Sequence, residues 1–156
     1  MNADEFNARY RVGTPVLAYP GVRPEDGWDD ETLITRTRSL AQVSASGDDV
    51  VWVEGHAGYI ILTHIDPVTE EAWEQARIDR DATIAGRRAA LLDAIRSRPC
   101  GGWRPERAAF AVKQAGFGPV SSRTAIGDLE ALAAEGHLTP VTEVIVRHYD
   151  LAAVSS

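Results

Sequence analysis

The stretch that decides the fold of this chain covers residues 120–138 and reads VSSRTAIGDLEALAAEGHL. Ser121 can accept a hydrogen bond from the free N–H groups of a helical first turn, which is the role of an N-cap. Apolar residues then recur at the spacing of one buried helical stripe: Ala125, Leu129, Leu132 and Ala133. Gly136 easily adopts the left-handed conformation that ends a helix. The stretch therefore predicts an amphipathic helix.

The opposite face of this helix carries short polar groups, one cation and no bulky side chain. Its members are Ser121, Ser122, Arg123, Thr124 and Gly127. Such a face can approach a phosphate backbone closely and enter a DNA major groove.

The run S-x-R-T-A-x-x-D-L-x-x-L-x-x-x-G-x-L resembles the recognition helix and wing of winged helix-turn-helix DNA-binding proteins. Residues 102–138 as a whole resemble small actinobacterial proteins of that kind. The resemblance implies binding of double-stranded DNA and a role in transcriptional or mobile-element regulation. It also implies a phosphate or base contact for Arg123 and a phosphate contact for Thr124. Ile126 and Gly127 follow Thr124-Ala125, where this superfamily often carries arginines.

Further DNA contacts are expected around this helix. Arg104, Arg107 and Lys113 belong to the preceding helical segment, which faces the DNA backbone in winged helices, while Arg147 and His148 belong to the expected wing strand. Ile126 could meet a thymine methyl group, or pack against the wing or a partner. The cations at 104, 107 and 113 could equally be ordinary surface residues, and His148 is more often a surface imidazole.

The charge is divided unevenly along the chain, whose net charge is −7. Residues 1–81 hold 7 arginines against 16 acidic residues, which is a net charge of −9. Residues 82–156 hold 8 arginines and 1 lysine against 7 acidic residues, which is a net charge of +2. The asymmetry suggests a division of labour, with nucleic-acid binding in the second half.

The first half favours short strands. Residues 1–8 are expected to be a loose tail, and strands are expected over 10–19, 32–44, 50–54 and 58–65, separated by Gly, Pro, Asp and Ser turns. The Val12-Gly13-Thr14-Pro15-Val16 opening and the apolar strand before Asp66-Pro67 resemble SH3-like barrels. Trp52 and Tyr59 are expected mainly in the barrel core, with a peptide- or base-binding face as the alternative.

From Thr69 to Arg98, the apolar residues recur at helical spacing, which predicts either one long helix or two helices that meet near residues 79–81. A further helix is expected from Pro105 to Gly116, buried through Ala108, Ala109, Val112 and Ala115, and a wing strand over 141–149 after a turn at Thr139-Pro140. The expected fold is α+β: an SH3-like barrel over 1–68, a helical connector over 69–81 and a winged helix over 82–156. The connector helix and its continuation, from Trp73 to Ile95, offer a surface for a homodimer.

Several function classes have no support in the sequence. Cys100 is the single cysteine, and His56, His64 and His137 lack partners at ligand spacing, so neither a disulfide nor a metal site is expected. No nucleophile motif or phosphate-binding glycine loop occurs, so we expect no enzyme and no cofactor. No apolar run reaches the ~20 residues of a membrane span; a cytoplasmic, nucleoid-associated protein is expected. The alternative is a protein-interaction adaptor or DNA mimic that uses Ile126 and the acidic barrel.

Overall fold

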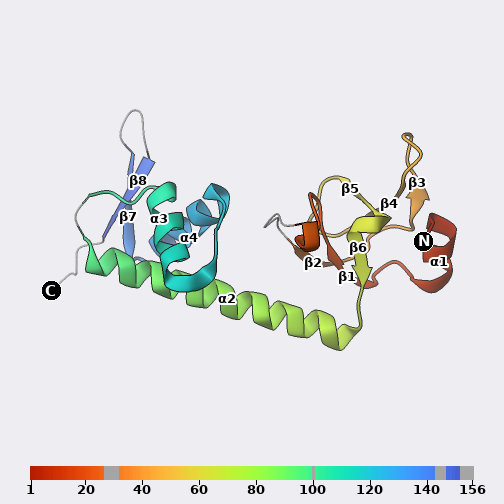
Figure 1. The fold of residues 1–156 in the computed structure, drawn as a ribbon, viewed down its shortest axis with the longest axis horizontal. Helices are drawn as coiled ribbons and strands as arrows, with labels where there is room; N and C mark the ends of the chain where they lie inside the picture. The colour runs from red at the N-terminus through yellow and green to blue at the C-terminus, as the bar shows by residue number, and fades with distance from the viewer. Residues whose placement is uncertain (27–31, 100, 143–146, 152–156) are drawn as a thin grey trace. The chain divides into compact units, whose positions relative to one another are not determined.

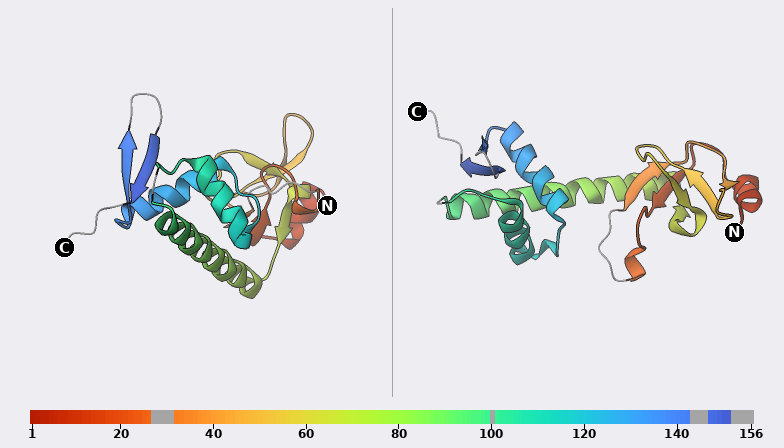
Figure 2. Two further views of the ribbon diagram at one scale, coloured as in Figure 1. Left: turned by 60° about the vertical axis from the view of Figure 1, so that its left-hand side comes forward. Right: turned by 90° about the horizontal axis from the view of Figure 1, so that it is seen from above.

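The computed structural model describes residues 1–26, 32–99, 101–142 and 147–151 and has a mixed α+β fold (Figure 1). The chain divides into two compact units, Met1–Arg80 and Asp81–Ser156, which are described separately below. Figure 2 gives two further views of the same elements. The three-part division at residues 68 and 81 stays a prediction about folding, and helix α2 runs without a break across the boundary expected at residue 81.

The first unit begins with a helix, α1 (Ala3–Arg9), where a loose tail was expected. Asn2 and Glu5 form a capping box: the Asn2 side chain accepts from the Glu5 N–H at 2.9 Å, and the Glu5 carboxylate accepts from the Asn2 N–H at 3.1 Å. Phe6 is 2% exposed and belongs to the core of the unit. The expectation of a tail was wrong because the capping box and the buried aromatic were overlooked.

Two three-stranded antiparallel sheets make up the rest of the first unit. In the first sheet, β1 (Pro15–Ala18) lies between β2 (Leu33–Arg36) and β6 (Ile65–Pro67). In the second, β4 (Asp49–Trp52) lies between β3 (Gln42–Val43) and β5 (Tyr59–Ile61). Short 3-10 turns cover Pro24–Asp26 and Leu62–His64. The alternate burial along β1 fits a sheet with one face on the core.

The single strand expected over residues 32–44 is divided between the two sheets. Its first part pairs with β1 as β2, an isolated bridge then joins Thr37 to Val53, and its last part pairs with β4 as β3. Thr37 is buried at this crossing, where its hydroxyl accepts from the Thr14 N–H and donates to the Arg11 carbonyl. The strands of the described residues do not close into a barrel.

Helix α2 (Glu70–Ser97) is one continuous helix of 28 residues, so the alternative of two helices is excluded. Its first turns are tied to β2: the Trp73 indole N–H donates to the Thr35 carbonyl at 3.0 Å. The Trp73 ring lies between two guanidinium groups, Arg36 at 4.3 Å and Arg77 at 4.9 Å from the ring centroid. These contacts are cation–π interactions and hold the helix start against the first unit.

The second unit places two helices after α2. Helix α3 (Pro105–Val112) starts with proline at a position where the missing N–H costs nothing, and leads into a π-helical turn, Lys113–Phe117. Gly116 adopts φ +92° inside this turn, whereas the regular helix, which was expected to run to Gly116, ends at Val112. Ala115 is exposed, contrary to its expected burial, because the regular helix has already ended at Val112. Helix α4 (Ser122–Ala134) follows.

A hairpin completes the second unit where a single strand was expected. Strand β7 (Leu138–Thr142) pairs antiparallel with β8 (Arg147–Leu151), and Thr139-Pro140 lies within β7 instead of forming a turn. Trp103 forms an isolated antiparallel bridge with Tyr149 of β8. The Trp103 N–H donates to the Tyr149 carbonyl at 2.7 Å, and the Tyr149 N–H donates to the Trp103 carbonyl at 3.0 Å. The order in this unit is helix, bridge residue, helix, helix, hairpin.

Each unit has its own core. The first core combines α1 with the inner faces of both sheets through Phe6, Val16, Val51, Val53 and Ile60. The second core combines α2, α3, α4 and the hairpin, and its buried members include Leu91, Ile95, Trp103, Val112, Leu129, Leu132 and Tyr149. Burial of such side chains contributes roughly 1.5–3 kcal/mol each and is the main force that holds each unit together.

Candidate nucleic-acid interface

Helix α4 begins as the sequence predicts. The Ser121 hydroxyl accepts from the Thr124 N–H at 3.1 Å, and the two hydroxyl oxygens of Ser121 and Thr124 lie 3.0 Å apart. The cap satisfies one of the N–H groups that a helix start leaves free. The hydroxyl of Ser121 therefore has a structural role, whatever else it contacts.

The two faces of α4 differ as expected from the apolar spacing. Ala125, Leu129 and Leu132 are buried, and Ala133 is half-buried. The other face exposes Ser122, Arg123, Ile126, Gly127 and Glu130. Ile126 is 38% exposed, so it is not packed away in the core of the unit. The exposed face of the first two turns thus carries one cation among small or neutral residues.

Arg123 and Gly127 are the two most informative residues of this face. Within the described residues, Arg123 makes no hydrogen bond or ion pair. Gly127 lies in the middle of α4 with ordinary helical backbone, and a Cβ atom added there would meet nothing within 4 Å. Glycine in a helix interior costs roughly 0.5–1 kcal/mol relative to alanine, and no internal packing requires it here.

Asp128 holds α4 against α2 and was not singled out from the sequence. It is 1% exposed and accepts from Arg87 through both oxygens, at 2.5 and 2.9 Å. Arg88 donates to the same carboxylate at 3.1 Å. The sequence spacing indicates that Asp128 is buried, because it belongs to the same i, i+3, i+4, i+7 stripe as Ala125, Leu129 and Leu132.

The basic residues around α3 have different surroundings. Arg104 is exposed at the N-cap position of α3, and Lys113 is exposed where the π-helical turn begins. Arg107 has a role inside the unit: its guanidinium lies 4.2 Å from the Trp103 ring centroid and donates to the Gly101 carbonyl at 2.6 Å. Arg104 and Lys113 are therefore the more accessible cations of the three.

The expected wing contacts fall on β8. Arg147 pairs with Thr142 and His148 with Val141 in the hairpin register, which assigns both residues to a strand, as expected. Their side chains lie outside the described part of the structure.

The first unit contains a partly exposed aromatic pair that was expected mainly in its core. Trp52 and Tyr59 are cross-strand neighbours on β4 and β5, and their ring centroids lie 5.7 Å apart at an interplanar angle of 75°. Trp52 is half-buried, whereas Tyr59 is 48% exposed, so core burial was wrong for Tyr59. Both rings lie on the sheet face opposite the buried Val51 and Ile60, because side chains alternate along a strand.

A polar cluster surrounds Tyr19 in the same unit. Arg23 binds Asp66 through two nitrogen atoms, with contacts of 2.5 and 3.1 Å, and its guanidinium lies 4.9 Å from the Tyr19 ring centroid. Burial of the phenol raises the pKa of Tyr19 above its ordinary value of 10.0, and the neighbouring Asp66 carboxylate raises it further. The cluster joins the end of β1 to β6.

The other polar residues weighed in the sequence have local roles. His64 Nδ1 lies 3.1 Å from the Tyr19 carbonyl oxygen, and Asp49 accepts from the Ala3 N–H at 2.9 Å. Asp48 accepts from Ser46 at 2.8 Å within its turn, and residues 29–31 lie outside the described residues. In the described ranges, no three His, Cys, Asp or Glu side chains gather as metal ligands would, and no helix is both long and apolar enough to span a bilayer.

No protein-family model matches this chain, and no curated protein sequence matches it either.

Proposed function

We propose that the second unit binds duplex DNA with the first turns of α4 against the major groove, as part of a transcriptional or mobile-element regulator. The observation that carries this proposal is the exposed face of α4. On this face, Arg123 has no partner among the described residues, and Gly127 lies inside the helix although no internal contact requires a glycine there. A missing side chain at Gly127 lets a partner approach the helix backbone closely.

The order of elements supports the same proposal. A helix, a bridge residue paired with the last strand, two further helices and a hairpin follow one another in the second unit. This is the order expected for a winged helix, with α3 and α4 as the helix-turn-helix pair and β7–β8 as the wing. The exposed Arg104 and Lys113 would then supply contacts to the DNA backbone.

We propose a distant SH3-like relationship for the first unit. Support comes from its two small antiparallel sheets, which are linked through the Thr37–Val53 bridge. In a DNA-binding protein, this unit would contribute the acidic charge and the partly exposed Trp52–Tyr59 pair.

The modest charge of the DNA-binding unit favours a homodimer. Phosphate contacts supply most of the affinity of DNA-binding proteins and make it salt-dependent, and a net charge of +2 over residues 82–156 offers few of them. Two copies double the number of contacts. The surface expected for this contact is the helix from Trp73 to Ile95. Trp73 is already engaged within its own unit, where it packs between Arg36 and Arg77.

The proposal is tested by fluorescence anisotropy with duplex DNA, comparing Arg123→Ala with the matched control Arg98→Ala. Arg98 is also exposed and precedes α3. A phosphate contact predicts that Arg123→Ala weakens binding equally on all sequences and lowers the salt slope by about one; a base contact predicts a loss of about 1–3 kcal/mol confined to one position of the site. Equal affinity of the two folded variants would refute the role assigned to α4.

A protein-binding function is the second candidate, and exposed apolar residues favour it. Phe110 on α3 is 59% exposed, and Ile126 on α4 is 38% exposed. Under this reading, the second unit binds a protein and the acidic first unit serves as an adaptor or DNA mimic. Ile126→Ser would then abolish partner binding, and no DNA affinity would be measurable at low salt.

A further inference from the structure

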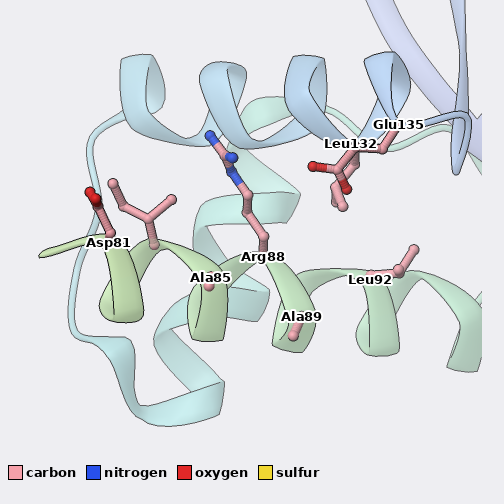
Figure 3. A pocket seen from close by; sticks show the side chains of 8 residues that line it. Asp81, Ala85, Arg88, Ala89, Leu92, Leu132 and Glu135 are labelled. Carbon is pink, nitrogen blue, oxygen red and sulfur yellow. The ribbon is translucent and has the colours of Figure 1, made fainter. Parts of the chain in front are cut away.

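Helix α2 lies along one side of α4, as Figure 3 shows. Arg88 reaches from α2 toward α4 on this side and binds the buried Asp128 at 3.1 Å. A groove of about 580 Å³ lies between the two helices, and its α4 residues are Leu132 and Glu135. The fold of the second unit therefore uses this side of α4, and a DNA contact requires another side.

Ile126 lies on the side of α4 that points away from α2. It precedes Asp128 by two residues, and two residues turn an α-helix by about 200°. Its side chain is 38% exposed. Arg123 comes three residues earlier, which is the spacing of neighbouring side chains on a helix surface, and it has no partner among the described residues. An exposed apolar side chain and a cation therefore lie next to each other.

Ile126 is the only large apolar side chain that the described residues of α4 expose. Its neighbours on that face are Ser122, Arg123, Gly127 and Glu130. A solvent-facing helix surface normally carries polar residues, and an apolar side chain gains free energy when an apolar group of a partner covers it. The Glu130 carboxylate, one turn later, is unfavourable beside phosphates, so we expect the DNA contact to end at Gly127.

The major groove of DNA offers one apolar group to such a side chain. Base edges there present hydrogen-bond donors and acceptors, and thymine adds a methyl group at C5. The minor groove presents no such methyl group. Residues 122–127 span five residue steps, about 7.5 Å at ~1.5 Å per residue, which is about the length of two base-pair steps of ~3.4 Å. The exposed part of the first two turns is thus large enough for contacts to two adjacent base pairs.

Gly127 allows Ile126 to reach a base. Isoleucine is shorter than arginine or glutamine, so it contacts a base edge only where the helix backbone comes close to the DNA. Gly127 has no side chain to hold the DNA away, and the space where its Cβ atom would lie is empty to 4 Å. The glycine and the isoleucine are adjacent in the chain, so the close approach and the apolar contact occur at the same part of the helix.

We infer that Ile126 contacts the C5-methyl group of a thymine and thereby gives the protein a preference for an A·T pair at that position. The inference deepens the proposed function and rests on it, because α4 must enter the major groove. The cation at Arg123 and the net charge of +2 on residues 82–156 favour a polyanion as the partner of this face.

Two duplexes that differ only in the methyl group provide the test. A duplex of alternating dA and dT presents thymine in every register, so Ile126 meets a methyl group wherever the protein binds. Replacement of every thymine with deoxyuridine removes the methyl groups and leaves base pairing unchanged. Burial of one methyl-sized group corresponds to about a fourfold change in the dissociation constant.

Fluorescence anisotropy of the full chain at low salt measures both affinities. The wild type should bind the deoxyuridine duplex about fourfold more weakly than the thymine duplex. Ile126→Ala should bind both duplexes equally, because it lacks the side chain that covers the methyl group. The matched control is Ile78→Ala, which makes the same change at an exposed isoleucine outside α4 and should keep the wild-type ratio.

Circular dichroism checks that each variant is folded, and Ile126→Ser replaces Ile126→Ala if that variant is not. Equal affinity of the wild type for the two duplexes would overturn this inference and leave the proposed function intact. A fourfold loss that persists in folded Ile126→Ala would also overturn it, because DNA shape or another residue would then cause the loss. A wild type that binds neither duplex at low salt would overturn the proposed function and this inference with it.

Discussion

Gly127 is a poor helix former that lies inside a helix, and the space around its Cα could hold a side chain. It lies inside α4, and a methyl group there would contact nothing within 4 Å. Alanine should therefore be accommodated without strain and should stabilise the second unit by roughly 0.5–1 kcal/mol, since it lowers the conformational entropy of the unfolded chain.

If the glycine allows DNA to approach, Gly127→Ala should raise stability and lower DNA affinity at the same time. Urea unfolding measures the first effect, and fluorescence anisotropy with duplex DNA measures the second. A gain of stability with unchanged affinity would show that the helix backbone at Gly127 does not approach the DNA closely.

At the scale of elements, the contact between α2 and α4 depends on one carboxylate. Asp128 is almost fully buried and binds Arg87, which is itself largely buried. Removal of one partner of a buried ion pair leaves the other charge without compensation, at a cost of about 3–5 kcal/mol. Asp128→Ala should therefore destabilise the second unit by that amount and weaken DNA binding only through loss of the fold.

Glu130→Ala is the control for this prediction, because it removes an exposed carboxylate from the same helix. Urea unfolding followed by circular dichroism compares the two variants. Similar small losses for both would mean that apolar packing of Leu129 and Leu132, and not the ion pair, holds α4 in place.

At the scale of the whole molecule, the charge of the first unit opposes DNA binding. Residues 1–69 hold 5 arginines against 11 acidic residues, a net charge of −6. A fragment of residues 70–156 keeps α2 intact and should bind non-specific duplex DNA more tightly than the full chain at low salt. The difference should shrink at higher salt, because the screening length falls to ~8 Å at 0.15 M.

Anisotropy titrations of the fragment and the full chain at two salt concentrations measure this effect. Tighter binding by the full chain at low salt would mean that the first unit contributes contacts of its own, for which Trp52 and Tyr59 are the candidates.

Local signals in the sequence determined the bounds and faces of α4, the start of α3 at Pro105 and the general change from strands to helices. Each of these depends on residues within a few positions of one another: the cap at Ser121, the apolar spacing through Leu132 and the left-handed glycine at 136. The capping box of α1 belongs to the same class of signal, so its helix was predictable in principle.

Only the tertiary structure decided which distant residues meet. The pairing of Trp103 with Tyr149, the division of residues 32–44 between two sheets and the burial of Asp128 against Arg87 join positions far apart in the chain. A strand propensity does not specify its partner, and the charge of a residue does not reveal whether water or another side chain surrounds it.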